Sequence, residues 1–537
     1  MLHSARLALV LATALAAVAL TGCGSGSASG GSDPASVIPA DASIYLQASV
    51  RPQGSLRGNA LAAAGKVLHT SDPQGTIRGW LDKALASSKS KVKLSYDKDI
   101  APWLGEKAGL WVDPSSVSGS GTASATSGGQ GFRGVVVLQA TDADKARQAL
   151  YADDGTGPYR KKTYNGVEYQ LNSEGTAAGI VGGFAVAGTE AEFKRAIAAS
   201  KGGSLAEADG YKQAVAKLAP GRLGQFYVNT KAIVDSLGAR DPAIRQQIQQ
   251  LGSVFSFDKY GPIAGSFSAD GDKLALDTLT TTSGATDQLK RLGLFGAGGA
   301  TKLVGELPGD SWAAYGVAGF GQSAKALFGQ AMGGLGGAAI AQQLRSQLGI
   351  DLDQDVFSWM GDLAGFVRGT TKDTVDGGLV IGVTDQGKAA TAFGKLIGVL
   401  RTRGGVDATP VRIEGAETAF QVRQPGAPKP IVLARSADRV VVAYGQAAAA
   451  EAFSPRSKLA DSDTYGAANS VLGDGYDPTV LVSMPEVVTL IESAAGGGSG
   501  AAGFAKAKPY LEAFGVIATG SKVADGTARS RVAAQLR

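Results

Sequence analysis

The chain contains four short sequence patterns that each occur twice, in the same order and at nearly constant spacing. This repetition limits the fold more than any other feature. The paired segments are Asp97–Gly109 with Asp353–Gly365, Thr141–Ala146 with Thr384–Ala389, Leu205–Tyr211 with Leu459–Tyr465, and Ala269–Gly271 with Ala524–Gly526. Ordered self-similarity of this kind indicates that one folded unit is present twice. We therefore predict two tandem related units, at residues 37–290 and 303–537.

The spacing between the copies changes only where the sequence has the composition of a loop. The first copy carries a Ser/Gly-rich insertion at Pro114–Gly131, and the second has longer turns at Arg403–Thr409 and Gln424–Pro430. Connections usually vary in length while the apolar elements of a core keep their register. The offsets therefore agree with two copies that share core elements and differ in their loops.

Local patterns in the first copy predict mostly strands. The predicted strands are Ile44–Val50, Ala108–Val112, Gly134–Thr141, Thr163–Asn172, Ala178–Gly188 and Gln225–Asn229, with a closing hairpin at Pro262–Thr281. Asn165–Gly166 predicts a tight turn inside Thr163–Asn172. Apolar residues at helical spacing predict helices at Asp142–Tyr151 and Glu190–Ser200. Hairpin-linked strands interrupted by single helices indicate the α+β class, in which each unit is an antiparallel sheet with helices packed on one face.

The N-terminus has the layout of a lipoprotein signal peptide at residues 1–22. Arg6 precedes an apolar run at Leu7–Leu20, which is shorter than the roughly 20 residues that a membrane-spanning helix needs. Leu20–Cys23 resembles a bacterial lipobox, in which the cysteine receives a lipid before cleavage. The alternative is an ordinary signal peptide followed by an incidental cysteine.

Cys23 is therefore the predicted lipidation site, bearing a diacylglyceryl group and, in many bacteria, a further acyl chain such as palmitate. Two or more acyl chains give stable membrane attachment, which one chain does not. The Gly/Ser-rich residues 23–36 then form a flexible tether. We expect the protein on the extracytoplasmic face of the cell membrane, with the lipid on Cys23 inserted in that membrane.

The composition excludes several classes of site. One cysteine and two histidines are too few for zinc clusters, iron–sulfur centres or disulfide frameworks. Cleavage of the signal peptide leaves His69 as the remaining histidine, and lipidation removes the thiol. The formal net charge of +5 is small for this length and the basic residues are scattered, so no nucleic-acid partner is expected. No cofactor or metal is expected either.

One acidic motif imitates a calcium loop. Asp351, Asp353 and Asp355 alternate as calcium ligands do, but Val356 and Asp362 stand where an EF-hand places Gly and Glu. Acidic residues recur at the matching place in the first copy. We interpret both clusters as caps of the short helix that leads to a tryptophan, where a negative charge is favourable.

Other motifs match only part of a catalytic or binding pattern. Gly319–Ala324 imitates a dinucleotide-binding turn, but no acidic residue follows where the ribose would need one. Ser88–Lys91 has the Ser-x-x-Lys spacing without its companion motifs. His69 is interpreted as a residue at a helix C-terminus. These sequences contain no catalytic constellation, so we do not expect an enzyme.

Aromatic residues at two places are interpreted structurally. Trp103 and Trp359 occupy matching positions in the two copies, and we predict that they anchor loops in the core. Tyr159–Tyr164 alternates basic and aromatic residues, which is typical of an exposed edge strand as well as of a nucleic-acid patch. We favour the edge strand.

The segment Ile38–Ala42 leading to Tyr45, together with Asp97–Gly105, resembles a known family. This is an uncharacterised family of bacterial extracytoplasmic lipoproteins, the domain of unknown function three-three-five-two. The resemblance covers nearly the whole mature chain, although the second copy is more degenerate, with Ser358 in place of the proline before Trp359. The family brings no established activity, so the resemblance implies an architecture and no mechanism.

Three hypotheses about function follow. The preferred one is a non-enzymatic lipoprotein that binds a ligand or an envelope protein. The second is a carrier for lipid or another apolar small molecule, which requires a pocket of roughly 300 Å³ or more. The third is a cell-envelope hydrolase that uses carboxylates such as Asp97 and Asp99, which would then have to face an open cleft.

Overall fold

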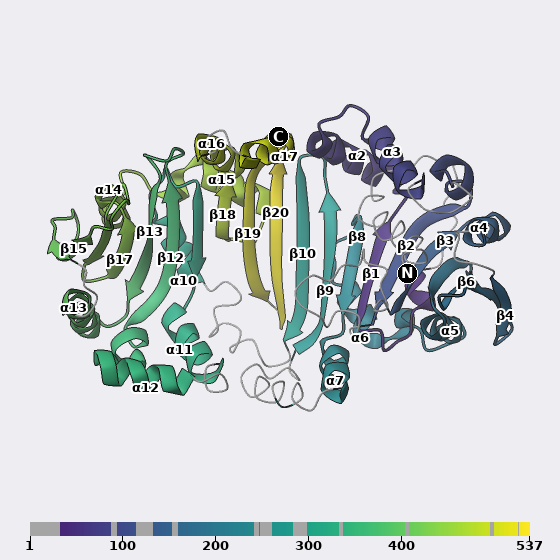
Figure 1. Ribbon diagram of the computed structural model, residues 1–537, viewed down its shortest axis with the longest axis horizontal. Coiled ribbons are helices and arrows are strands. Elements are labelled where there is room, and N and C mark those ends of the chain that lie inside the picture. Colours follow the sequence, from purple (N-terminus) through teal and green to yellow (C-terminus); the bar gives the residue numbers. More distant parts are fainter. Residues whose placement is uncertain are drawn as a thin grey trace. The chain divides into compact units, whose positions relative to one another are not determined.

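The protein is described by a computed structural model, drawn in Figure 1. The residues described are 33–86, 94–113, 133–152, 159–240, 246, 260–282, 298–331, 337–402, 407–494, 499–524 and 526–537. Cys23, the predicted signal peptide, Ser88–Lys91 and the insertion Pro114–Gly131 lie outside these residues. The chain divides into unit 1, comprising Met1–Gln249 and Phe257–Thr281, and unit 2, comprising Gln250–Ser256 and Thr282–Arg537.

Unit 1 is built on one sheet whose strands run in the order β10–β9–β8–β1–β2–β3–β7–β6–β5–β4, antiparallel from β9 to β4. The strands are β1 (Ile44–Ser49), β2 (Leu104–Val112), β3 (Gly134–Ala140), β4 (Arg160–Tyr164), β5 (Val167–Leu171), β6 (Thr176–Val181), β7 (Phe184–Thr189), β8 (Gly224–Val228), β9 (Tyr260–Ala269) and β10 (Lys273–Thr282). The helices are η2 (Pro34–Val37), α2 (Gly54–Leu68), α3 (Pro73–Ala86), η3 (Tyr96–Ile100), α4 (Ala143–Leu150), α5 (Glu190–Ala199), η5 (Leu205–Glu207), α6 (Asp209–Val215) and α7 (Thr230–Arg240).

Unit 2 has a sheet in the order β20–β19–β18–β11–β12–β13–β17–β16–β15–β14, with antiparallel pairs throughout. The strands are β11 (Ala313–Val317), β12 (Met360–Arg368), β13 (Asp376–Val383), β14 (Ala408–Pro410), β15 (Thr418–Val422), β16 (Ile431–Arg435), β17 (Arg439–Tyr444), β18 (Pro478–Ser483), β19 (Phe514–Ala524) and β20 (Thr527–Leu536). The helices are α10 (Gly298–Gly305), α11 (Phe320–Ala331), α12 (Gly337–Leu348), η7 (Leu352–Phe357), α13 (Gln386–Thr402), α14 (Gln446–Phe453), η8 (Leu459–Asp461), α15 (Asp463–Leu472), α16 (Met484–Ala494) and α17 (Ser499–Glu512). This is the pairing order of unit 1 repeated.

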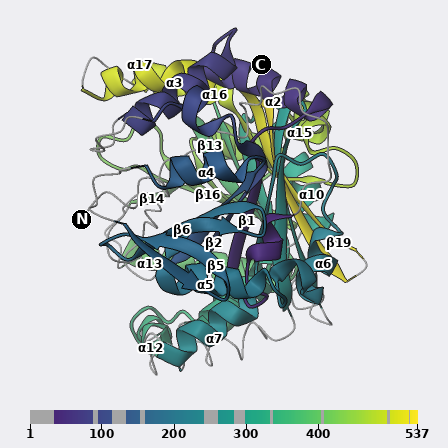
Figure 2. The same ribbon diagram turned by 90° about the vertical axis from the view of Figure 1, so that its right-hand side faces the viewer.

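The α+β class predicted from the sequence is confirmed, but in unit 1 the helices cover both faces of the sheet and not one. Val135 and Val137 of β3 pack in the same cluster as residues of α5 and α6. Val136 and Leu138 point to the other face, into the cluster formed with α3 and α4. Figure 2 shows α4 and α6 on opposite sides of β1. Continuous apolar runs such as that of β3 mark strands buried on both faces.

Glycine turns correct one predicted strand. Ala178–Gly188 forms a hairpin of β6 and β7, because Gly182 and Gly183 lie between them with φ of +58° and +86°. The Asn165–Gly166 turn has the positive φ angles expected of a two-residue hairpin. Glycine adopts this region without a steric penalty, so the chain reverses where a continuous strand would not.

Trp103 and Trp359 make the same set of contacts in the two units, and both are buried. The indole Nε1 of Trp103 donates to the Asp99 carbonyl at 2.6 Å, and that of Trp359 donates to the Asp355 carbonyl at 2.9 Å. The carbonyl oxygen of each tryptophan accepts a hydrogen bond from a threonine amide, at 2.7 Å in unit 1 and 2.8 Å in unit 2. The prediction that these residues anchor loops in the core is confirmed.

The edge-strand interpretation of Tyr159–Tyr164 is confirmed as well, because among the described strands β4 pairs only with β5, and it is largely exposed. An ionic cluster ties β4 to α5: Lys162 Nζ lies 3.0 Å from Glu190 Oε1, and Lys194 Nζ lies 2.9 Å from the same oxygen. The Tyr169 hydroxyl donates to it at 2.8 Å. The hydrogen bonds from Lys194, Lys162 and Tyr169 lower the pKa of Glu190 to about 2.

Replacing Trp103 by alanine should lower the free energy of unfolding by about 3–5 kcal/mol, because a large buried ring is lost and a cavity remains. Trp103→Phe keeps most of the ring and removes the hydrogen bond to Asp99, so it should cost about 1 kcal/mol. Urea unfolding of the mature chain measures both values. Equal losses for the two variants would contradict the core-anchor role.

The contribution of Glu190 to the free energy of unfolding should depend on pH. Its pKa in the folded protein lies below the ordinary value, so this contribution is present above pH 4.5 and is lost as the pH falls towards about 2. Glu190→Gln should therefore be less stable than the wild type at neutral pH, and the difference should shrink below pH 4.5. Urea unfolding at a series of pH values tests this. Glu168→Gln, in an exposed pair with Lys161, is the control and should change stability by less than about 1 kcal/mol.

Candidate functional site

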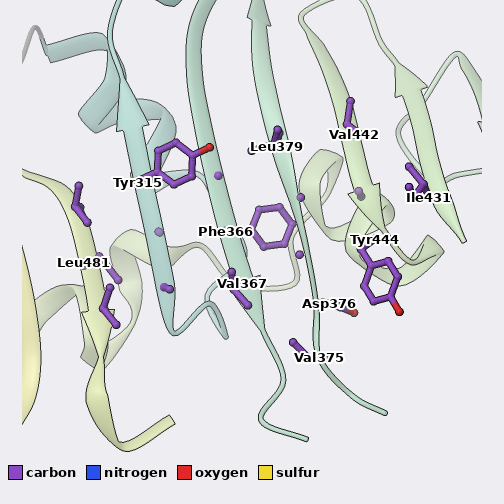
Figure 3. Close-up of a pocket in the computed structure, with 18 residues that line it drawn as sticks. Tyr315, Phe366, Val367, Val375, Asp376, Leu379, Ile431, Val442, Tyr444 and Leu481 are labelled. Carbon is purple, nitrogen blue, oxygen red and sulfur yellow. The ribbon is translucent and has the colours of Figure 1, made fainter. Parts of the chain in front are cut away.

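One face of the unit 2 sheet carries an apolar groove of about 600 Å³. It is formed by six adjacent strands, β18, β11, β12, β13, β17 and β16, and Figure 3 shows the side chains that line it. The lining residues are Ala313, Ala314, Tyr315, Gly365, Phe366, Val367, Val375, Asp376, Gly377, Gly378, Leu379, Ile431, Val442, Ala443, Tyr444, Val480, Leu481 and Val482. Almost all of them are apolar.

The register of the strands arranges this lining in three consecutive rows. The first row is Val480, Tyr315, Gly365, Leu379 and Val442. The third row is Val482, Ala313, Val367, Gly377, Tyr444 and Ile431. The middle row is Leu481, Ala314, Phe366, Gly378 and Ala443. Because side chains alternate along a strand, the outer rows project into the groove and the middle row projects to the other face.

The first row presents large apolar side chains to solvent. Val480, Tyr315 and Leu379 are 37%, 38% and 39% exposed, and Figure 3 shows Tyr315, Leu379 and Val442 side by side across the strands. An ideal Cβ built on Gly365 would lie 2.4 Å from the Tyr315 ring and 3.1 Å from Leu379. A larger residue would therefore compete with both for space. A contiguous exposed apolar surface of this kind marks a binding site more often than chance exposure.

Helix α13 covers the adjoining part of the same face. Phe393 and Ile397 of α13 pack with Leu433 and Val440 in a buried cluster. Leu433 and Val440 lie on the same side of β16 and β17 as the groove residues. The groove begins where this cover ends, so the fold leaves part of a core-like apolar face open to solvent.

The charge at the end of the groove is compensated. Asp376 accepts two hydrogen bonds from the Arg368 guanidinium, at 2.9 and 3.1 Å, and the Lys429 ammonium lies 3.8 Å from the same carboxylate. Arg368 also lies 3.2 Å from Asp310. Among the described residues that line the groove, Asp376 is the one acidic residue, and none is basic. The described lining of the groove therefore contains no unpaired charge.

The cluster at Asp351 caps its short helix, as the sequence predicts, and Asp99 is the residue of the first cluster that accepts an amide of its own turn. Asp351 Oδ1 accepts the amides of Asp353 and Gln354 at 2.9 and 3.1 Å. The carboxylate of Asp355 accepts the Asp351 amide at 2.8 Å, and Asp99 accepts the Ser95 amide at 2.7 Å in the same way. Hydrogen bonding from the Gln354 amide helps to hold the pKa of Asp351 below its usual value.

The acidic side chains do not gather into a metal site within the described part of the chain, where His, Cys, Asp and Glu form no group of three suited to a metal. Asp97, the other acid of the first copy, is exposed and lies 3.7 Å from Arg78.

The remaining sequence motifs have structural roles. Gly319 has a φ of +55° and its amide donates to Asp362 at 2.7 Å, while an ideal Cβ on Gly321 would lie 2.2 Å from the Met360 carbonyl. Gly319–Ala324 is thus the segment at which α11 packs closely against β12. His69 is the C-cap of α2, in the left-handed conformation with φ 48°, as the sequence predicts.

A buried tyrosine cluster in unit 1 was not identified from the sequence. Tyr45 donates to Gln47 at 3.0 Å, and Gln225 donates to the Tyr211 hydroxyl at 2.9 Å. Tyr211 also packs edge-on against Tyr45 and Tyr227. Burial raises the pKa of both Tyr45 and Tyr211, so the hydroxyls stay neutral. The cluster satisfies polar groups inside the core.

The groove residues were also not identified from the sequence. Two signals were present, namely the glycines at 365, 377 and 378 inside strands and the isolated Tyr315 between small residues. Glycine inside a strand often marks a place where a ligand or another backbone approaches closely. Neither signal alone says which face of the sheet is left uncovered.

Comparisons with solved structures and curated proteins give few functional clues. The chain is similar to "Structure of crystal form I of TP0453", with 9% identity and a TM-score of 0.24 over 48% of this chain and 81% of that chain. For "Structure of crystal form IV of TP0453" the values are 8%, 0.25, 49% and 86%. No curated protein matches. Among the described helices, none has the length and apolar character needed to cross a membrane.

A family model matches almost the whole sequence, from residue 2 to residue 536. The match agrees with the resemblance seen in Ile38–Ala42 and Asp97–Gly105, and the family carries no described activity. The chain belongs to the family described as "Protein of unknown function (DUF3352)".

Proposed function

We propose that this protein is a membrane-anchored, extracytoplasmic lipoprotein that binds an apolar ligand in the groove of unit 2. The observation that carries this proposal is the open apolar concavity of about 600 Å³. Its volume falls in the range of roughly 300–1,000 Å³ typical of small-molecule sites. The carrier hypothesis required such a space.

The physical reason for binding is the exposed apolar area of the groove. The side chains of Tyr315, Leu379 and Val480 are partly exposed to solvent in the folded protein. A ligand that covers them removes their apolar surface area from water. Burial of apolar surface contributes about 25 cal/mol per Å². An apolar ligand gains this contribution twice, from its own surface and from the surface it covers.

The anchor is the second part of the proposal. The lipobox at Leu20–Cys23 supports attachment through lipid on Cys23, and the tether would let the folded units reach ligands near the membrane surface. An apolar ligand leaves a bilayer at a large cost in free energy, because its hydrocarbon meets water. A binding protein anchored at that surface shortens the distance that the ligand has to travel through water.

Carboxylate-dependent hydrolysis receives less support. A general acid or base needs a carboxyl group aimed at an open cleft. The carboxylates of Asp99, Asp351 and Asp355 instead accept backbone amides of their own turns. We therefore propose a binding function and not a hydrolytic one.

Leu379→Glu should weaken binding of the uncharged fluorophore N-phenylnaphthylamine by at least about tenfold, because a carboxylate would have to lose water inside an apolar site. The measurement is a fluorescence titration of the mature chain. Leu396→Glu is the matched control, because Leu396 lies on α13 outside the groove and is exposed to the same extent, 39%.

Equal losses of affinity in the Leu379 and Leu396 variants would contradict the assignment of the site to the groove. Thermal unfolding of both variants shows whether either substitution perturbs the fold. If the fluorophore did not bind to the wild type, the apolar-ligand function itself would be contradicted.

Cys23→Ala should move the protein from the membrane fraction to the soluble fraction of its host, because the attachment atom for the lipid is gone. Incorporation of labelled palmitate should be lost at the same time. Cys23→Ser is a conservative control that should behave in the same way. Continued membrane retention of both variants would contradict the anchor.

A further inference from the structure

We infer that the groove takes one unbranched hydrocarbon chain of a membrane lipid, extended at right angles to the strands. This inference rests on the proposed apolar-binding function and names the class of ligand. Three features of the groove carry it: its dimensions, its floor and its lack of unpaired charge.

The strand register sets the dimensions. The two outer rows lie two residues apart along each strand, which corresponds to about 7 Å at about 3.4 Å per residue. The third row runs without a bulge from Val482 on β18 to Ile431 on β16. Five strand spacings of about 4.8 Å give a length of about 24 Å. The lining therefore extends much further across the strands than along them.

The floor and walls follow from the same alternation. The middle row turns its side chains to the other face, where Leu481, Ala314 and Phe366 are buried. Only backbone remains beneath the ligand. On one side stand Tyr315 and Leu379, and Figure 3 shows Val367 and Tyr444 on the other side. A single chain fits between two such walls, whereas a ring system wider than the spacing of about 7 Å between the rows does not.

The uncharged lining favours a ligand segment that carries no charge inside the groove. Asp376 is bound by Arg368 and flanked by Lys429, and the rest of the described lining is uncharged. A charged group on the ligand would lose water without gaining a partner. The polar end of a lipid therefore stays outside the groove, and the chain alone enters.

Unit 1 provides an internal contrast. The row paired like the first groove row consists of Phe226, Leu46, Leu110, Val136 and Ala187. Leu110 stands where unit 2 has Gly365, and Val136 and Ala187 are buried in the cluster that contains α4. Part of the corresponding strip of unit 1, at Val136 and Ala187, is thus covered by the protein itself, whereas Leu46 in the same row is 38% exposed. In unit 2 the ligand chain covers the part that α4 covers in unit 1.

The first test is a series of straight-chain alcohols of increasing length that compete with N-phenylnaphthylamine for the mature wild-type chain. Each added methylene should tighten binding about fourfold, because burial of a CH₂ contributes about 0.8 kcal/mol. The gain should stop once the chain exceeds the length of the groove. Branched alcohols of equal carbon number should bind more weakly, because they exceed its width.

The second test changes the two ends of the groove separately. Val480→Glu alters the β18 end and Ile431→Glu alters the β16 end. For an alcohol long enough to fill the groove, each substitution should weaken binding at least about tenfold. For a short alcohol, at most one of them should have an effect. Leu396→Glu again serves as the control.

The outcomes separate this inference from the proposed function. If neither the fluorophore nor any alcohol binds, the apolar-binding function itself is wrong. If the fluorophore binds but affinity does not depend on chain length or on both ends, the function stands and the extended-chain ligand is wrong. Chain-length dependence with sensitivity at both ends supports the inference.

Discussion

The alternation of side chains along a β-strand is the constraint on which both units depend. Each strand has two faces, and a helix or loop must cover whichever face is apolar. In unit 1 the run of valines in β3 is apolar at every position, so helices cover it from both sides. In unit 2, α13 covers the face of β16 and β17 only in part. The uncovered part is the groove.

Much of the fold follows from local signals in the sequence. The Asn165–Gly166 turn, the helices after Asp142 and Thr189, and the buried Trp103 and Trp359 all depend on residues close to one another in the chain. Turn-forming residues and helix caps act on neighbouring residues, so they can be recognised from the sequence without knowledge of the tertiary structure. The hairpin at Gly182–Gly183 was missed because the flanking apolar residues read as one continuous strand.

The groove could not be predicted for a different reason. Whether Leu379 is exposed depends on how much of the sheet face α13 covers. The position of α13 is set by packing between segments that are distant in the sequence. Aligned glycines also mislead, since Gly109 and Gly365 match in the sequence but lie on opposite faces. An added Cβ on Gly109 would meet Tyr45 in the core, whereas one on Gly365 would meet Tyr315 at the groove.

The cause of this mismatch is a bulge at the start of β2 and β12. In β2 the step from Leu104 to Ala108 pairs with the step from Ala140 to Leu138. In β12 the shorter step from Met360 to Leu363 pairs with the step from Val383 to Ile381. Beyond the bulge, the two strands therefore differ by one residue in register. Loss or gain of a single codon at this point exchanges the two faces of a strand while the ladder of backbone hydrogen bonds continues. A repeated protein can thereby change which side chains of one strand lie on a covered face and which lie on an open one.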